Sequence, residues 1–278
     1  MIVWLASYPK SGNTLLRSIL SSYFFSKDGI FDFSLLKNIP NFPEINFFNN
    51  LQIDTSNELE ISKNYISAQN LINDGNKNKI IFLKTHSSLC KINNYNFTDN
   101  KNTLGCIYIV RDPRNVVLSK ANHFYQNYEE ATEDLFREVG LKNDNNPAVK
   151  TFVGSWSFNF QSWKRMPKNS FLLIKYEDLI LNKEIVIKKI FKFLENLTNS
   201  PIKIDQKKIK NILKSTDFHR LKTLEKEKGF EEASKKKDKI TPFFHLGPEN
   251  DWKNFLPKKL QEKIENKLFH EMKELEYL

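Results

Sequence analysis

Tyr8-Pro9-Lys10-Ser11-Gly12-Asn13-Thr14 is the stretch of sequence that decides the fold. An apolar run at residues 2–6 comes shortly before it and predicts a buried strand. Apolar residues then recur at helical spacing over residues 15–24, which predicts a helix directly after it. The first turn of a helix has unpaired backbone N–H groups and the positive end of the helix dipole. The sequence therefore predicts an anion-binding turn between a strand and a helix.

The side chains of this turn suit an anion. Gly12 lets the backbone approach a ligand closely, and Lys10 adds a full positive charge. The hydroxyls of Ser11 and Thr14 add hydrogen-bond donors. The Walker A pattern of nucleoside triphosphatases places its lysine after a second glycine. Here the lysine precedes the glycine and the first glycine is missing, which disfavours a triphosphatase. A plain turn whose polar residues cap the helix is the alternative.

The rest of the chain alternates apolar runs with helical patterns. Further strands are predicted at residues 79–84, 106–110 and 171–176, and further helices at 58–73, 183–195, 205–215 and 257–276. Continuous apolar strands between helices are typical of a parallel sheet covered on both faces. We therefore expect an α/β protein with a P-loop-like, three-layer fold and a central, mostly parallel sheet flanked by helices. We expect residues 1–278 to form a single domain, with a mobile loop at 222–244 over the active site.

Composition and charge limit the classes of protein to which this chain can belong. The chain of 278 residues is 40% hydrophobic and has a formal net charge of +10. Six of its 43 basic residues are arginine, the side chain that reads bases and clamps phosphates. The lysines are mostly interleaved with acids, so no nucleic-acid partner is expected, although a basic nucleic-acid-binding module stays open as an alternative. No apolar run reaches about 18 residues, so no membrane span is expected. Cysteine spacing and the lack of a basic leader predict a cytoplasmic protein.

A second candidate phosphate site follows the third predicted strand. Arg111 lies where this strand meets a helix, and Ser119 lies on the helix itself. A guanidinium holds a phosphate through charge-assisted hydrogen bonds, and a serine hydroxyl adds another. In the alternative, Asp112 and Pro113 simply begin the helix and the arginine makes surface ion pairs. Two anion sites in one α/β chain favour a ligand with more than one phosphate group.

Lys84-Thr85-His86 ends the second predicted strand. Sheets of α/β proteins bind ligands at the carboxyl ends of their strands, so this histidine lies where a ligand is expected. A lone histidine is otherwise more often structural than catalytic, and that alternative stays open.

These segments resemble those of the PAPS-dependent sulfotransferases, which use 3′-phosphoadenosine-5′-phosphosulfate (PAPS) and release the bisphosphate PAP. Residues 8–14 are similar to the family's phosphosulfate loop, 111–119 to its 3′-phosphate segment, and 84–86 to its Lys-Thr-His segment. Weaker similarities are Tyr176-Glu177-Asp178, Thr216-Asp217-Phe218, and residues 245–254 with Gly247 and Asp251-Trp252-Lys253-Asn254. All segments stand in the family's order.

The resemblance implies which residues act. It implies His86 as the general base, with Lys10 and Lys84 as catalytic cations. It implies that PAPS is bound by Lys10, Ser11, Gly12, Asn13, Thr14, Leu15, Arg111, Ser119, Tyr176, Thr216, Phe218, His245 and Gly247. Leu15 replaces the family's adenine-stacking tryptophan, and His245-Leu246 replaces an Arg-Lys pair. We therefore expect adenine to be held mainly from elsewhere, with Phe218 as the best candidate.

The resemblance also implies the reaction. A sulfuryl group moves from PAPS, with no metal required, to a hydroxyl or amine of a small-molecule, carbohydrate or lipid acceptor. The family's dimer segment is partly matched, since Pro257-Lys258 stands in place of its Thr-Val, and we expect a monomer or a homodimer. A nucleoside-phosphate kinase on the same architecture is the second hypothesis.

Overall fold

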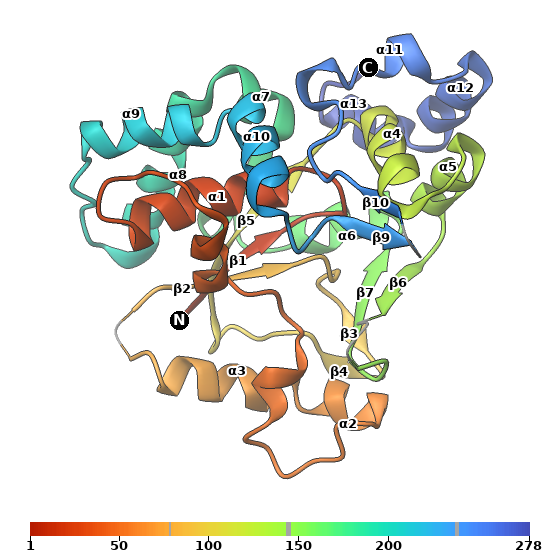
Figure 1. Cartoon of the computed structure of the whole chain (residues 1–278). Coiled ribbons are helices and arrows are strands. Elements are labelled where there is room, and N and C mark those ends of the chain that lie inside the picture. Colours follow the sequence, from red (N-terminus) through yellow and green to blue (C-terminus); the bar gives the residue numbers. More distant parts are fainter. Residues whose placement is uncertain (78, 143–145, 237–238) are drawn as a thin grey trace.

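The described residues form a four-stranded parallel sheet at the centre of the computed structural model (Figure 1). The structure describes residues 1–77, 79–142, 146–236 and 239–278. The strands lie in the order β2 (Ile81–Thr85), β1 (Ile2–Ala6), β5 (Thr103–Val110) and β8 (Phe171–Lys175), and every neighbouring pair is parallel. Because β1 lies between β2 and β5, the strand order reverses at β1. Ligands of α/β proteins bind at such a switch point.

Successive side chains of β1 point to opposite faces of the sheet. Ile2, Trp4 and Ala6 are fully buried in one apolar core, whereas Val3 and Leu5 are fully buried in a second core. Neither face of β1 is open to water, which explains why its sequence is apolar at every position. The predicted three-layer α/β fold is confirmed.

Helices cover both faces of the sheet (Figure 1). The core around Val3 and Leu5 includes the 3₁₀ helix η1 (Phe33–Asn38) and helices α1 (Asn13–Phe25), α7 (Tyr176–Leu181), α8 (Lys183–Thr198), α9 (Gln206–Ser215) and α10 (Phe218–Lys228). The core around Trp4 includes η2 (Ile45–Phe48), α2 (Glu58–Lys63), α3 (Tyr65–Asp74), α4 (Pro113–Phe124), α5 (Tyr128–Phe136), α6 (Trp156–Lys164), α12 (Lys258–Lys267) and α13 (Phe269–Glu274). Shorter elements are η3 (Lys168–Ser170), η4 (Gly247–Glu249) and α11 (Trp252–Phe255).

Antiparallel hairpins lie outside the main sheet. They pair β3 (Lys91–Ile92) with β4 (Tyr95–Asn96), β6 (Val139–Lys142) with β7 (Lys150–Gly154), and β9 (Ser234–Lys236) with β10 (Lys239–Thr241). Among the described residues, no helix combines the length and apolar character that a bilayer crossing needs.

The stretch at residues 222–244, predicted to be a loop, is partly regular. Its first residues are the last turns of α10, which ends before Gly229 with φ 72. The Glu225 carboxylate accepts hydrogen bonds from the N–H groups of Phe243 and Phe244, and so ties the two ends of the stretch together. The loop prediction was wrong for the end of α10, which is helical up to Lys228, and for β9 and β10, which pair as antiparallel strands. Mobility of the stretch stays a prediction.

Two isoleucines of α8 test the assignment of the core. Ile190 is fully buried, whereas Ile185 is 67% exposed. Ile190→Ala should lower the free energy of unfolding by about 2–5 kcal/mol, because it removes buried methyl groups and leaves a cavity. Ile185→Ala is the matched control and should change it by about 0.5 kcal/mol or less. Urea denaturation followed by circular dichroism measures both, and equal losses would contradict the described packing of α8.

Candidate active site

The predicted site residues gather at the carboxyl end of the parallel sheet, around a cavity of about 660 Å³. The predicted residues that line it are Lys10, Gly12, Asn13, Thr14, Leu15, Lys84, His86, Arg111, Ser119, Tyr176, Thr216, Phe218, His245 and Gly247. Ser11 does not line the cavity and is fully buried instead. Segments that are far apart in the sequence therefore meet at one hollow.

The turn between β1 and α1 has the backbone of an anion site. Gly12 precedes α1 with φ 101, and Lys10 also has a positive φ of 68. A left-handed backbone costs a residue such as lysine about 1–2 kcal/mol, and such strain is concentrated at functional sites. Among the described residues no side chain caps α1. The first N–H groups of the helix are therefore available to a ligand.

Two buried donors near the turn have no partner in the described part of the chain. They are the hydroxyl of Ser11 and Nε of Arg111. A buried donor without a partner costs about 1–3 kcal/mol, and such groups are normally satisfied by protein, ligand or water. Arg111 lines the cavity, so its Nε suits an oxygen atom of a phosphate there. The residues present therefore fit a phosphate-bearing ligand.

The ring of Tyr176 connects the turn with Arg111. The Arg111 guanidinium lies 4.3 Å from the centre of this ring, and its Nη1 donates to the Lys10 carbonyl over 3.2 Å. A Cβ atom at Gly12 would lie 2.3 Å from the same ring. Glycine is required here because of both its positive φ and the ring. These contacts fix Arg111 in the wall of the cavity.

Phe218 packs against the backbone of Gly247 in another part of the wall. A Cβ atom at Gly247 would lie 2.4 Å from the Phe218 ring, and Gly247 has φ 57. Leu15 lines the same cavity and is 8% exposed. An aromatic ring beside an apolar side chain can hold a planar base.

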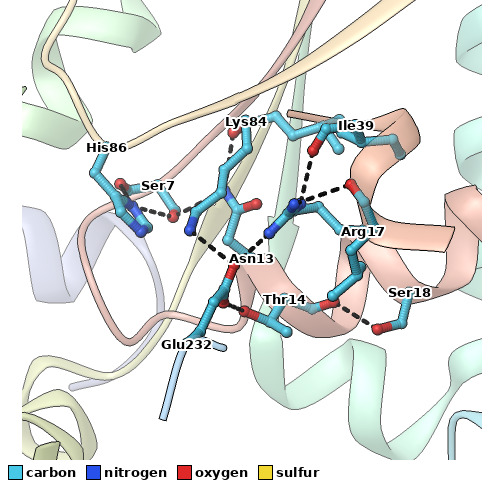
Figure 2. A network of polar contacts seen from close by, with 11 residues as sticks. Ser7, Asn13, Thr14, Arg17, Ser18, Ile39, Lys84, His86 and Glu232 are labelled. Atoms are coloured by element: carbon cyan, nitrogen blue, oxygen red, sulfur yellow. Dashed lines mark hydrogen bonds and ion pairs between the residues drawn. The ribbon is translucent and has the colours of Figure 1, made fainter. Parts of the chain in front are cut away.

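His86 is held with its proton on Nδ1. This nitrogen lies 2.9 Å from the Ser7 carbonyl oxygen and 3.1 Å from the Ser7 hydroxyl (Figure 2). A carbonyl only accepts, so Nδ1 donates and Nε2 carries the free lone pair. Asn13 donates to the Ser7 hydroxyl over 3.1 Å and so supports this arrangement. Burial, followed by the charge of Lys84, lowers the pKa of His86 to about 3. The imidazole is therefore neutral at physiological pH and can accept a proton.

Three predicted cations, Lys10, Lys84 and Arg111, share the cavity. Burial is the main cause that lowers the pKa of Lys10 to about 7, and the charges of Lys84 and Arg111 add to it. Burial also lowers the pKa of Lys84. Nζ of Lys10 lies 3.8 Å from the centre of the Phe243 ring. An anion in the cavity would relieve the repulsion between these cations, so the site favours a polyanionic ligand.

Glu232 in the cavity wall, and Arg17, which contacts it, were not predicted. The Glu232 carboxylate accepts hydrogen bonds from Thr14 and Arg17 and forms an ion pair with Lys84 (Figure 2). Arg17 had a signal in the sequence, because it follows Thr14 by three residues and therefore lies on the same face of α1. Glu232 had none, since it is one acid in a charged stretch that lies 218 residues from Thr14.

The matching family model describes a sulfotransferase domain and covers residues 2–276. The chain therefore belongs to the sulfotransferase domain family, as its motifs predicted. Flavonol 3-sulfotransferase of Flaveria bidentis is 26% identical over 277 residues, which cover 95% of this chain and 79% of the relative. Sulfotransferase 1 family member D1 of Mus musculus is 24% identical over 278 residues, which cover 98% of this chain and 83% of the relative.

Solved structures share the fold. Mouse sulfotransferase SULT7A1 complexed with PAP has a TM-score of 0.57 and 18% identity, over 97% of this chain and 83% of that one. Retinol dehydratase in a complex with retinol and PAP has a TM-score of 0.59 and 16% identity, over 98% of this chain and 81% of that one. The fold class is confirmed by these structures and the enzyme class by the family: the chain is a sulfotransferase.

Proposed function

We propose that this enzyme transfers a sulfuryl group from PAPS to a hydroxyl or amine of a small-molecule, carbohydrate or lipid acceptor and releases PAP. The observation that carries the proposal is that the two predicted phosphate-binding positions line one cavity. One is the turn before α1 with Lys10, and the other is Arg111 with Ser119. His86, whose Nε2 has a free lone pair, lines the same cavity.

The turn before α1 would hold the 5′-phosphosulfate, and Arg111 and Ser119 would hold the 3′-phosphate. PAPS carries about four negative charges if its phosphomonoester counts for roughly two. Lys10, Arg111 and the free N–H groups of α1 offset much of this charge. Tyr176 and Phe218 would flank the adenine from the cavity wall.

His86 would take the acceptor's proton through Nε2 while the acceptor oxygen or nitrogen bonds to sulfur. The bond between this sulfur and the bridging oxygen of the phosphosulfate breaks, and PAP leaves with the electron pair. Lys10 and Lys84 would stabilise the negative charge on the bridging oxygen and on the transferring group. Positioning and electrostatics supply most of the catalysis, as in phosphoryl transfer.

Apolar side chains favour an acceptor with an apolar part. Phe124, Leu141 and Phe243 line the cavity that contains His86, and they lie outside the donor motifs. By its name the plant relative acts on a flavonol, and one solved structure contains retinol. Both agree with a small-molecule acceptor.

Further properties belong to this proposal. Residues 1–278 act as one domain, and the described residues of the segment 222–244 form a mobile cover over the active site. The enzyme works in the cytoplasm as a monomer or homodimer. Glu232 lines the cavity, which supports the covering role of the segment. Cys90 and Cys106 are free thiols, as is usual where disulfides are rare.

His86→Ala should lower kcat by about 10²- to 10⁴-fold, which is the usual contribution of a general base, while PAP affinity stays near its wild-type value. His270→Ala is the matched control, because His270 is exposed on α13 and does not line the cavity. Rates of PAP formation across phenolic, carbohydrate, lipid and amine acceptors measure the first effect, and calorimetry with PAP measures the second. Full activity of His86→Ala on an accepted substrate would remove this histidine from the base role.

PAP binding at pH 8 should take up protons, because the pKa of Lys10 is lowered to about 7. Most Lys10 is neutral at pH 8, and the 5′-phosphate favours its charged form and so raises the pKa. The uptake should approach about one proton and should shrink as the pH falls towards 6, where Lys10 is already charged. Calorimetry in buffers of different ionisation enthalpy measures it. Lys10→Arg stays charged and should reduce the uptake, and an equal uptake in this variant would show that another group titrates.

A further inference from the structure

A carboxylate lies at the end of the cavity next to the turn. Glu232 accepts from Thr14 Oγ1 over 2.8 Å and from Arg17 Nη1 over 2.5 Å, and it lies 3.4 Å from Lys84 Nζ. The three donors belong to α1 and β2, whereas Glu232 belongs to the segment between α10 and β9. Figure 2 shows Glu232 reaching from this segment to α1 and to Lys84. Parts of the chain that are distant in sequence are thus joined by one anion.

The Arg17 donor is held in place by contacts other than Glu232. The Arg17 side chain is 7% exposed, and its Nε and Nη2 donate to the carbonyls of Ile39 and Leu36 over 3.0 and 3.1 Å. Nη1 is the nitrogen left for an anion. Lys84 is 12% exposed and lies on β2 in the central sheet. Donors fixed in this way bind an anion with little ordering cost.

These donors require a counter-charge. Buried cations such as Arg17 and Lys84 are strongly unfavourable unless they are paired. Burial opposes ionisation of Glu232, but Lys84 and Arg17 lower its pKa below the usual range. Glu44 also lies near these two cations, but burial raises its pKa. Glu232 is the carboxylate that forms ion pairs with both cations, over 2.5 Å to Arg17 and 3.4 Å to Lys84.

Two of the donors are also proposed to bind PAPS. Thr14 belongs to the phosphosulfate turn, and Lys84 is proposed to contact the transferring sulfuryl group. Carboxylate and sulfo oxygens accept from the same kinds of donor. Two anions bound at once to the Thr14 hydroxyl and the Lys84 ammonium would repel each other strongly, because they would lie very close together. Glu232 and a sulfo group therefore exclude each other at this position.

We propose that Thr14, Arg17 and Lys84 bind the sulfo group of PAPS, and that Glu232 competes with this group for the same donors. The inference rests on the proposed use of PAPS. It assigns Arg17 a direct contact with the sulfo group. PAP lacks the sulfo group and does not have to displace the carboxylate. Glu232 therefore lowers the preference of the enzyme for PAPS over PAP, and PAPS binding displaces the segment that carries it.

Calorimetry of PAP and PAPS without an acceptor tests this competition. Glu232→Gln keeps the size of the side chain and removes its charge. The variant should bind PAPS about tenfold more tightly than wild type, whereas its PAP affinity should change by less than about threefold. Glu231→Gln is the matched control: Glu231 is exposed and also lines the cavity, but the contacts described for Thr14, Arg17 and Lys84 are made by Glu232 and not by Glu231. This control should keep the wild-type ratio of the two affinities.

Variants of Arg17 test the second half of the proposal. Arg17→Gln should weaken PAPS binding by about tenfold or more and leave PAP within about threefold, because a charge-assisted hydrogen bond to the sulfo group is lost. Circular dichroism checks folding, because Arg17 also binds the carbonyls of Ile39 and Leu36. If Arg17→Gln does not fold, Arg17→Lys and Glu232→Gln carry the test.

The outcomes distinguish a failure of the proposed competition at the sulfo position from a failure of the proposed use of PAPS. A PAPS-to-PAP preference that is unchanged or lower in Glu232→Gln would overturn the shared site. Equal losses of PAP and PAPS affinity in a folded Arg17 variant would overturn the contact with the sulfo group. A wild-type protein that binds neither ligand would overturn the proposed donor itself.

Discussion

The start of α1 at the carboxyl end of β1 is the feature on which the rest of the site depends. It brings free N–H groups and the positive end of a helix dipole to the switch point of a parallel sheet. Lys10 and Gly12 turn the chain there through left-handed backbone conformations. The neighbouring strands β2 and β5 run in the same direction as β1 and end at the same edge. This geometry brings Lys84, His86 and Arg111 together, because each of these residues lies at or just beyond the end of one of these strands.

Burial and the mutual repulsion of cations determine the electrostatics of the cavity. Burial keeps His86 neutral, as its proposed role as a base requires, and it lowers the pKa of Lys10 and Lys84. A polyanionic ligand favours the charged lysines, so ligand binding and lysine protonation are coupled. Glu232 also offsets part of the positive charge at this site, because it forms ion pairs with Arg17 and Lys84. The charge of the cavity is thereby linked to the segment proposed to cover it.

The features that the sequence predicted best are local ones and the ends of strands. Asp112 caps α4 as predicted, because an Asp before a proline at the first helical position needs no distant contact. The structure differs from the sequence-based prediction where side chains compete with the backbone for hydrogen bonds, or where segments distant in sequence meet. The predicted helix at 58–73 is interrupted at Asn64, whose side chain donates to a carbonyl of the preceding turn. The Glu232 contact spans 218 residues of sequence, and no local periodicity encodes it.

The ratio of the affinities for PAP and 5′-AMP, measured by calorimetry on the wild-type protein, is the most direct test of a cavity with two phosphate positions. PAP carries the additional 3′-phosphate that Arg111 and Ser119 are proposed to bind. A hydrogen bond to a charged group contributes about 1.5–3 kcal/mol, so PAP should bind roughly 10- to 100-fold more tightly than 5′-AMP. Equal affinities would contradict the assignment of Arg111 and Ser119 to the 3′-phosphate.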